Sequence, residues 1–323
     1  MNKHIVTFLL TMLLFSSICI SYSIWKVEGI SIFTSKGNTI YVGGIGPGNY
    51  TNIQNAINDA NDGDTIFVYN GTYYENHILI NKTLFLKGED KNTTIIDGDE
   101  GGDIIYLTKD EIHLSGFTIR NSGNIKDTEG IFIYHANNCY IKDNNILLIQ
   151  EHGIWCFRGN NNTISGNTIN YIANGLVLTF SDNNKIINNN ISNNGAGVIL
   201  DESKNNLVTE NIISNNYIGM GLCSFDSNIG RNTITRNNII KSKQLGIDID
   251  RSSYNKIEQN NLIGNKRHAK FYSSFYTQWK ENYWGRQRML PKPILGIYHD
   301  LFQIPYLNFD WYPAREPYDT SNL

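Results

Sequence analysis

Residues 153–178 read GIWCFRGNNNTISGNTINYIANGLVL, and residues 175–200 read GLVLTFSDNNKIINNNISNNGAGVIL. Each stretch opens with a glycine that is followed by alternating apolar residues. These glycines recur at intervals of 22, with one glycine 23 residues before the series and one 27 residues after it: Gly130, Gly153, Gly175, Gly197, Gly219 and Gly246. A fixed period of this length predicts a repeat architecture, in which each unit buries its apolar face only against its neighbours.

A second signature, Asn-x-Ile-x-x-Asn-x-Ile, lies between the glycines, for example at Asn162, Ile164, Asn167 and Ile169. Apolar alternation at period two is typical of β-strands. The two isoleucines are five residues apart, so a flat strand would place them on opposite faces, and a bend between them is needed to bring both inside. Asparagine suits such bends because it tolerates left-handed backbone. The sequence therefore predicts an all-β, single-stranded, right-handed parallel β-helix of about nine coils, each of roughly 21–27 residues.

Like side chains of successive coils are expected to lie directly over one another. The first asparagines of the signatures are then predicted to form an internal ladder of side-chain hydrogen bonds: Asn162, Asn184, Asn205, Asn232 and Asn255. The second asparagines are predicted to form another ladder, which Glu210 interrupts: Asn167, Asn189, Asn237 and Asn260.

Four segments are predicted along the chain. Residues 1–23 carry an almost wholly apolar run, which is the layout of a secretory signal peptide, or of an anchor if it is not cleaved. Residues 24–64 form a lead-in, in which Thr51–Ala60 has the apolar spacing of a short helix that would cap the open end of the stack. The β-helix is expected over 65–270, and an aromatic tail that packs on it over 271–323. We therefore expect a secreted or cell-surface protein.

Charge and composition exclude several classes of partner. The 323 residues carry a formal net charge of -3, which predicts neither nucleic-acid binding nor a polybasic membrane patch. Membrane contact is expected only through residues 1–23. The cysteine spacing is not that of a zinc site, so no metal is predicted. Six Asn-x-Ser/Thr sequons are candidate glycosylation sites: Asn49, Asn70, Asn81, Asn92, Asn161 and Asn190.

The outward positions of the coils supply the candidate binding residues. The column two residues after the repeated glycine is apolar or aromatic until its last member: Phe132, Trp155, Val177, Ile199, Gly221 and Asp248. The next outward column begins with Tyr134 and Phe157. An apolar column on a solvent face needs a partner, and three are open: the aromatic tail, a sugar that lies against the rings, or another protein chain. The candidate ligand-binding residues are Phe132, Tyr134, Trp155 and Phe157.

Candidate catalytic residues lie at the last coil of this alignment, where Asp248, Asp250 and Arg251 stand together. Two carboxylates at i and i+2 of one strand share a face about 7 Å apart, a spacing that suits acid–base hydrolysis or a calcium-assisted lyase. An arginine beside them could bind a uronic acid. The alternative interpretation is a solvated polar flank. No cofactor is expected, and Ca²⁺ would be needed only by a lyase.

Several stretches resemble a known group of proteins. Residues 55–68 (NAINDANDGDTIFV), then Gly71-Thr72-Tyr73, Leu86-Lys87-Gly88, Ile96-Asp97-Gly98 and the Asn/Ile/Gly coils resemble the NosD-type and wider CASH group, which have PbH1 repeats and a pectin-lyase-like β-helix. The resemblance covers about residues 40–265. The tail, with Asn282-Tyr283-Trp284-Gly285 and Asn308-Phe309-Asp310-Trp311, resembles that of secreted archaeal members.

The group mixes carbohydrate-binding surface proteins, sugar hydrolases and lyases, and a periplasmic accessory protein for copper-site maturation. With the outward aromatic column, the resemblance implies binding of extracellular or cell-wall polysaccharide. A hydrolase or lyase that uses Asp248, Asp250 and Arg251 is the second hypothesis, and a structural envelope or adhesion protein is the third. A copper role is less favoured, because the 7 histidines and 4 methionines form no cluster in the sequence.

Overall fold

The computed structural model describes residues 37–123, 128–226, 229–299 and 303–319. All of them belong to one compact unit, Ser35–Leu323. The predicted signal peptide or anchor, residues 1–23, lies outside the described residues. Within the described residues, no helix is long and apolar enough to cross a bilayer.

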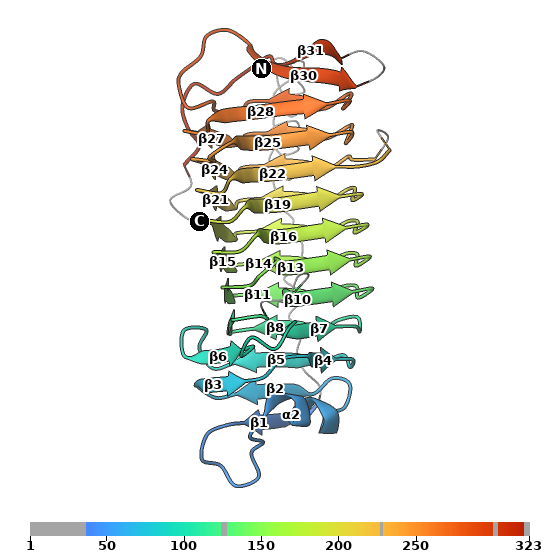
Figure 1. The fold of residues 1–323 in the computed structure, drawn as a ribbon, viewed down its shortest axis with the longest axis vertical. Helices are drawn as coiled ribbons and strands as arrows, with labels where there is room; N and C mark the ends of the chain where they lie inside the picture. The colour runs from blue at the N-terminus through green and yellow to red at the C-terminus, as the bar shows by residue number, and fades with distance from the viewer. Residues whose placement is uncertain (1–36, 124–127, 227–228, 300–302, 320–323) are drawn as a thin grey trace, which may run out of the picture. The chain divides into compact units, whose positions relative to one another are not determined.

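The chain winds into a stack of coils in which each strand pairs in parallel with the equivalent strand one coil away (Figure 1). Each full coil contributes three strands, so the stack has three rows. The stack has about eleven turns, against the nine expected, because strands outside residues 65–270 also take part. The predicted fold class, an all-β parallel β-helix, is confirmed.

The first row contains the longest strands, and we call it the long-strand row. Its members are β4 (Ile78–Ile80), β7 (Ile105–Leu107), β10 (Glu129–Tyr134), β13 (His152–Phe157), β16 (Asn174–Thr179), β19 (Ala196–Asp201), β22 (Ile218–Cys223), β25 (Leu245–Asp250) and β28 (Arg267–Tyr272). The recurring glycine lies in this row, where a side chain has no room. A Cβ on Gly153 would lie 2.6 Å from the carbonyl oxygen of Gly175 in the next coil.

The second row follows the first bend of each coil. Its members are β1 (Thr39–Val42), β2 (Thr65–Val68), β5 (Phe85–Gly88), β8 (His113–Ser115), β11 (Tyr140–Lys142), β14 (Thr163–Ser165), β17 (Lys185–Ile187), β20 (Leu207–Thr209), β23 (Thr233–Thr235), β26 (Lys256–Glu258) and β29 (Gln278–Lys280). Strand β1 lies within the predicted lead-in, so the stack begins before residue 65.

The third row closes each coil. Its members are β3 (Gly71–Tyr74), β6 (Thr94–Asp97), β9 (Thr118–Arg120), β12 (Asn145–Leu147), β15 (Thr168–Asn170), β18 (Asn190–Ser192), β21 (Ile212–Ser214), β24 (Asn238–Ile240) and β27 (Asn261–Ile263). The two isoleucines of one signature therefore lie on different rows, and both point inward: Ile164 is on β14, Ile169 is on β15, and neither is exposed. Ile164 lies directly beside Ile186 of the next coil.

Asparagines at the bends form ladders along the stack. In the first ladder, the Asn184 side-chain oxygen accepts from the backbone N–H of Asn162 at 2.8 Å. The next rung is Asn206 and not the predicted Asn205, because the Asn206 Oδ1 accepts from Asn184 N at 2.8 Å. Asn205 is exposed and occupies the left-handed bend at φ 58°. The ladder continues through Asn232 and Asn255.

The second ladder is continuous, so the predicted interruption at Glu210 is wrong. Asn211 occupies the rung, and its Oδ1 accepts from Asn189 N at 2.9 Å. Glu210 is one residue earlier, in the left-handed bend at φ 57°. The ladder ends at buried Asp310, which accepts from Asn282. A third ladder was not predicted: Asn194 N donates to Asn216 Oδ1 at 2.8 Å, and Ser242 takes the next rung, where its backbone N–H donates to Asn265 Oδ1 at 2.8 Å.

Helix α2 (Ile53–Asp59) covers the start of the stack and falls within the predicted Thr51–Ala60. It begins at Asn52, whose side chain accepts from Asn55 N at 2.8 Å. The helix buries Ile53, Ala56 and Ile57.

The far end of the stack is closed by the C-terminal tail. Strands β30 (Lys292–His299) and β31 (Gln303–Asp310) form an antiparallel hairpin. β30 pairs with β28, and β31 pairs with β29 through Trp279 and Asp310 (Figure 1). The hairpin therefore forms the last layer of the stack, while Tyr318 lies back against β27, where its backbone N–H donates to Asn261 Oδ1 at 2.9 Å.

Candidate functional site

An aromatic surface lies on the outer face of the long-strand row. Strand register places Tyr106, Phe132 and Trp155 side by side in one outward column, and Tyr134 beside Phe157 in the next. We call these five residues the aromatic strip. The register follows from the buried positions between them, because inward and outward residues alternate along each strand.

Rings of neighbouring coils stack along the axis of the strip. The ring centroids of Phe132 and Trp155 are 4.6 Å apart with planes inclined by 13°, and those of Tyr134 and Phe157 are 6.0 Å apart with planes inclined by 5°. The planes of the two columns are inclined to each other, by 54° between Phe132 and Tyr134.

The strip is partly open to solvent. Tyr134 is 44% exposed, whereas Phe132, Trp155 and Phe157 are half-buried. The described residues of the tail pair with β28 and β29, several coils away from the strip, and do not cover these rings. Polar groups border the rings: the Trp155 Nε1–H donates to Thr179 Oγ1 at 3.1 Å, and the Arg158 guanidinium lies 5.2 Å from the Phe157 ring centre.

A buried acidic cluster adjoins the strip on the side of the N-terminal coils. Glu129 is 2% exposed, and its Oε1 lies 3.1 Å from His152 Nδ1. Burial and neighbouring Asp103 raise the pKa of Glu129 to about 7, although His152 opposes this rise. The Tyr106 hydroxyl donates to Asp103. The His152 ring stacks on Trp155 with centroids 5.1 Å apart, so this cluster contacts the strip directly. The sequence analysis did not identify Glu129.

The predicted catalytic residues lie farther along the same face. Asp248 and Asp250 are on β25 with both side chains half-buried, and Arg251 Nε lies 3.3 Å from Asp250 Oδ1. Lys270 Nζ lies 3.8 Å from Asp248 Oδ2, while Asp248 Oδ1 is buried and has no hydrogen-bond partner among the described residues. Burial raises the pKa of Asp248, Lys270 lowers it, and Asp250 raises it further. The structure thus brings the three predicted residues together and adds Lys270.

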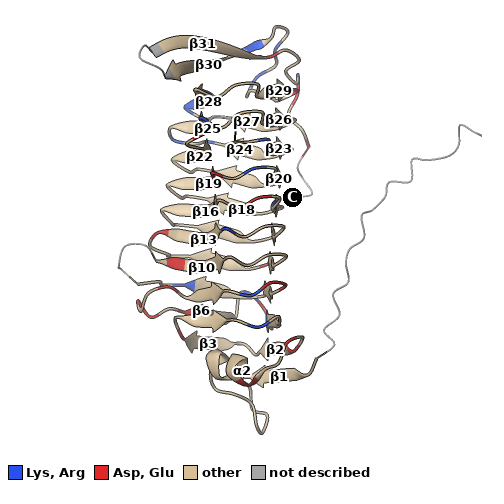
Figure 2. Ribbon diagram, turned by 90° about the vertical axis from the view of Figure 1, so that its right-hand side faces the viewer, with Lys and Arg blue, Asp and Glu red and all other residues tan. Residues whose placement is uncertain are grey.

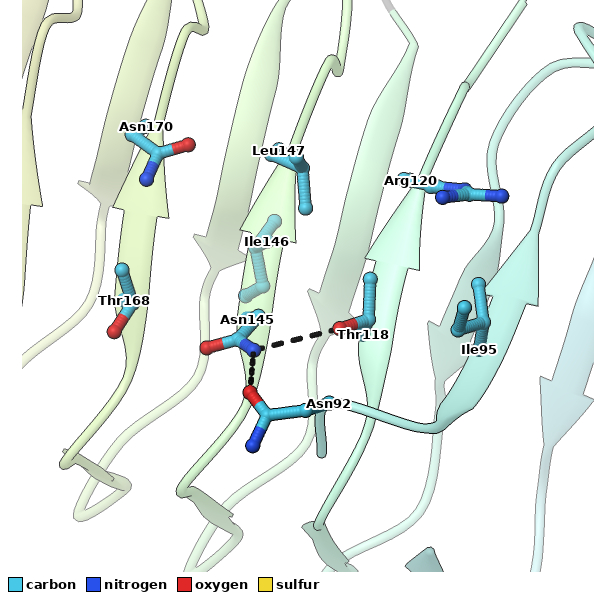
Figure 3. Close-up of a pocket in the computed structure, with 9 residues that line it drawn as sticks. All are labelled: Asn92, Ile95, Thr118, Arg120, Asn145, Ile146, Leu147, Thr168 and Asn170. Carbon is cyan, nitrogen blue, oxygen red and sulfur yellow. Dashed lines mark hydrogen bonds between the residues drawn. The ribbon is translucent and has the colours of Figure 1, made fainter. Parts of the chain in front are cut away.

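A groove of about 380 Å³ lies on a different face, over the third row (Figure 3). Its lining consists of amides, hydroxyls, one arginine and three aliphatic residues: Asn92, Ile95, Thr118, Arg120, Asn145, Ile146, Leu147, Thr168 and Asn170. The Asn145 amide donates to Asn92 Oδ1 at 3.3 Å and to Thr118 Oγ1 at 3.4 Å (Figure 3). The sequence analysis missed this groove, since its residues come from four separate coils.

Arg120 is fixed at one side of the groove. Its Nε donates to Asp97 Oδ2 at 2.7 Å. Burial alone would raise the pKa of Asp97, but hydrogen bonds from Arg120 and Asn121 hold it below its ordinary value. The ion pair therefore stays charged, and Arg120 contributes a positive charge to the groove lining.

The candidate glycosylation sites differ in accessibility. Five of the six sequon asparagines are exposed: Asn70, Asn81, Asn92, Asn161 and Asn190. Asn49 is half-buried, and its amide donates to the carbonyl of Gly43 at 2.6 Å. Within the residues that the structure describes, no group of three or more His, Cys, Asp and Glu side chains is arranged to hold a metal ion.

Comparison with known proteins agrees with the coil geometry. A family model described as right handed beta helix region matches residues 103–263. The pectate lyase Pel9A superposes with a TM-score of 0.55 and 14% identity, over 76% of this chain and 80% of that one. XylC in complex with xylose gives a TM-score of 0.51 at 13% identity, over 85% and 73% of the two chains. ORF18 of Geobacillus virus E2 gives 0.50 at 12% identity, over 80% of this chain and 59% of that one.

At these identities the likeness concerns the fold. The protein is a right-handed parallel β-helix. No curated protein matches the chain. The narrower resemblance to the NosD-type and CASH group stays a prediction.

Proposed function

We propose that this protein is exported or displayed at the cell surface and binds polysaccharide along the aromatic strip. The observation that carries the proposal is a column of partly exposed rings on one outer face, which the C-terminal tail leaves uncovered. Contiguous exposed apolar surface of this kind marks a binding site more often than chance.

The dimensions and chemistry of the strip suit a short stretch of a sugar chain. Tyr106, Phe132 and Trp155 lie on three successive coils, and the next residue of their column, Val177, is buried. Three coils at a spacing of about 4.8 Å make the strip roughly 10 Å long. Pyranose rings have apolar C–H faces and hydroxyl rims, which can contact rings and hydrogen-bonding groups together. Arg158 at the border of the strip supplies such donors.

Binding to a panel of uronate and neutral glycans tests this function. Tyr134→Ala should weaken binding on the order of tenfold, as expected for a central aromatic contact. Trp155→Ala should do the same, and thermal unfolding of the variant separates lost binding from lost structure. Trp311→Ala is the matched control, because this exposed tryptophan lies at the far end of the stack. Unchanged affinity in both strip variants, at intact stability, would rule the strip out.

One observation favours a second candidate, a polysaccharide hydrolase or lyase. Burial raises the pKa of Asp248 beside Asp250, and a carboxyl of raised pKa next to another carboxylate is the arrangement that general acid catalysis uses. In a lyase, Arg251 would bind the uronate carboxylate and Ca²⁺ would be the expected cofactor. New reducing or unsaturated ends that disappear in Asp248→Asn would establish this activity. Absence of both binding and cleavage would leave a structural envelope or adhesion role.

A further inference from the structure

The C-terminal end of the stack carries many exposed large apolar side chains. Those of the segment around the hairpin are Met289, Leu290, Leu295, Ile304, Tyr306, Leu307, Trp311 and Tyr312. Met289 is 87% exposed and Leu290 is 76% exposed. Exposure of this extent at neighbouring positions is costly unless a partner covers them.

Several of these side chains form one surface. Leu295 of β30 lies directly opposite Leu307 of β31. Phe309 is two residues beyond Leu307 and so shares its face, and the Trp311 ring lies 4.9 Å from the Phe309 ring. Lys292 pairs with Asp310 at the open end of the hairpin. Met289 and Leu290, which precede β30, therefore lie at the same end as Trp311 and Tyr312, which follow β31. We call Met289, Leu290, Leu295, Leu307, Trp311 and Tyr312 the end-cap surface.

Three cations without a counterion among the described residues lie near the end-cap surface, although Lys292 shares the strand face of buried Ile294 and so points toward the stack. Arg286 is exposed, Arg288 and Lys292 are half-buried, and the ion pairs among the described residues include none of the three. Lys and Arg segments, drawn in blue, lie at the base of the hairpin (Figure 2). Burial, followed by Arg288 and Arg286, lowers the pKa of Lys292. The nearby carboxylate of Asp310 is turned inward, where it accepts from the Trp284 Nε1–H at 3.0 Å.

The site has unused hydrogen-bonding capacity as well as unbalanced charge. Arg288 Nε and His268 Nδ1 are buried without a partner among the described residues. The Lys292 ammonium lies 5.5 Å from the centre of the Trp284 ring, which holds it close to Arg288. Positive charges that lower one another's pKa are stabilised when an anion binds between them.

We propose that the end-cap surface binds an anionic lipid bilayer from outside, with Met289, Leu290 and Trp311 in the interfacial region and Arg286 and Arg288 against lipid phosphates. Peripheral membrane contact needs apolar side chains and cations together. Tryptophan and tyrosine at the border, here Trp311 and Tyr312, favour the same interface. The overall net charge of -3 does not oppose this contact, because charges more than about 10 Å away are largely screened.

Two other partners fit the surface less well. A second copy of the chain, placed cap to cap, would bring its own three unpaired cations against those of the first. A sugar chain gains little from aliphatic Met289 and Leu290, which offer no ring face. Only a partner that is both negatively charged and apolar contacts the cations and the aliphatic side chains favourably at the same time.

Hydrogen exchange on the full chain tests the proposal, since it reports on the cap separately from residues 1–23. Peptides over 286–312 should become protected by phosphatidylcholine vesicles that contain phosphatidylglycerol, and should not be protected by phosphatidylcholine alone. Arg286→Gln combined with Arg288→Gln should weaken this protection about thirtyfold in lipid concentration, roughly fivefold for each charge. Leu290→Glu should abolish it.

The matched control is Ile45→Glu, which changes a fully exposed isoleucine near the opposite end of the stack and should leave protection intact. The proposal is overturned if the 286–312 peptides exchange at the same rate with and without anionic vesicles. It is also overturned if acidic polysaccharide protects them where vesicles do not, or if their protection rises with protein concentration in the absence of lipid, which would indicate self-association.

Discussion

Two glycines on one strand provide a direct test of coil packing. Gly219 and Gly221 both lie on β22, and neither has the left-handed φ that only glycine adopts readily. A Cβ on Gly219 would lie 2.5 Å from the carbonyl oxygen of Gly246 and 2.8 Å from Ile239 Cγ2. A Cβ on Gly221 would meet only Ile199 Cγ1, at 4.0 Å. The same substitution should therefore have opposite effects two residues apart.

The expected magnitudes follow from these distances. Real Cβ atoms essentially never approach within 3.0 Å, so Gly219→Ala must push the neighbouring coil outward by at least 0.5 Å (3.0 - 2.5 Å). Overpacking costs about 1–3 kcal/mol, and loss of glycine flexibility in the unfolded chain returns about 0.4–1 kcal/mol. The difference between these two effects lowers the free energy of unfolding of Gly219→Ala by about 1 kcal/mol, which lowers Tm by a few degrees. Gly221→Ala should be neutral or stabilise by a few tenths of a kcal/mol.

Urea denaturation of both variants beside the wild type measures the difference. A shift of the midpoint without a change of slope assigns the effect to stability. If Gly219→Ala were as stable as Gly221→Ala, the repeated glycine would not be needed for close coil contact, and the steric argument for the 22-residue repeat would fail.

Asn189→Ala removes a buried amide whose oxygen accepts from Asn167 N and Nδ2, both at 3.0 Å, so it should lower the free energy of unfolding by about 3 kcal/mol. Asn190→Ala, at an exposed neighbour, should change the free energy of unfolding by less than about 0.5 kcal/mol. Equal denaturation midpoints for the two variants would contradict the ladder. Burial and Asp103 raise the pKa of Glu129 from 4.5 to about 7, so the folded state holds the proton more tightly than the unfolded chain does. The contribution of Glu129 to the free energy of unfolding is therefore fully present below pH 4.5 and is lost as the pH rises through 7. Glu129→Gln should remove that loss, and a denaturation series from pH 5 to about 8 in which the two proteins decline in parallel would show that Glu129 does not titrate there.

The sequence was sufficient to predict the stacked coils because the same residue pattern recurs in successive coils. Every coil carries the same glycine and the same paired isoleucines, so one error in alignment does not change the fold. The sequence of a single coil determines the strand register less well. At Asn205-Asn206 two asparagines are adjacent, and Leu207 and Val208 are both apolar, so either frame satisfies the pattern. Only burial separates them, with Val208 inside and Leu207 half-exposed.

Features that depend on non-repeating segments could not be predicted in the same way. The tail has no period, so its composition indicated packing on the stack without indicating which part of the stack. The hairpin closes the end because its strand edges pair with β28 and β29, a choice that depends on backbone geometry. Glu129 was missed for a related reason. It is one residue before the repeated glycine, where other coils carry His152 or Asn174, and its half-buried partner Asp103 comes from a coil without the repeat.

The stacked geometry of the aromatic strip separates residues that support the fold from residues that are available to a ligand. The Phe132 ring packs against the Trp155 ring, with centroids 4.6 Å apart, and makes an edge contact with the Tyr106 ring at 6.0 Å. Phe132→Ala should therefore lower the free energy of unfolding by about 2 kcal/mol, as expected for a half-buried ring, and should affect sugar binding less. Tyr134 is inclined by 54° to Phe132 and is the most exposed ring of the strip, so Tyr134→Ala should weaken binding and leave the denaturation midpoint nearly unchanged. Measuring both properties in both variants tests this division directly. The reverse pattern, with affinity lost in Phe132→Ala and kept in Tyr134→Ala at equal stability, would mean that a ligand contacts Phe132 despite the rings packed against it.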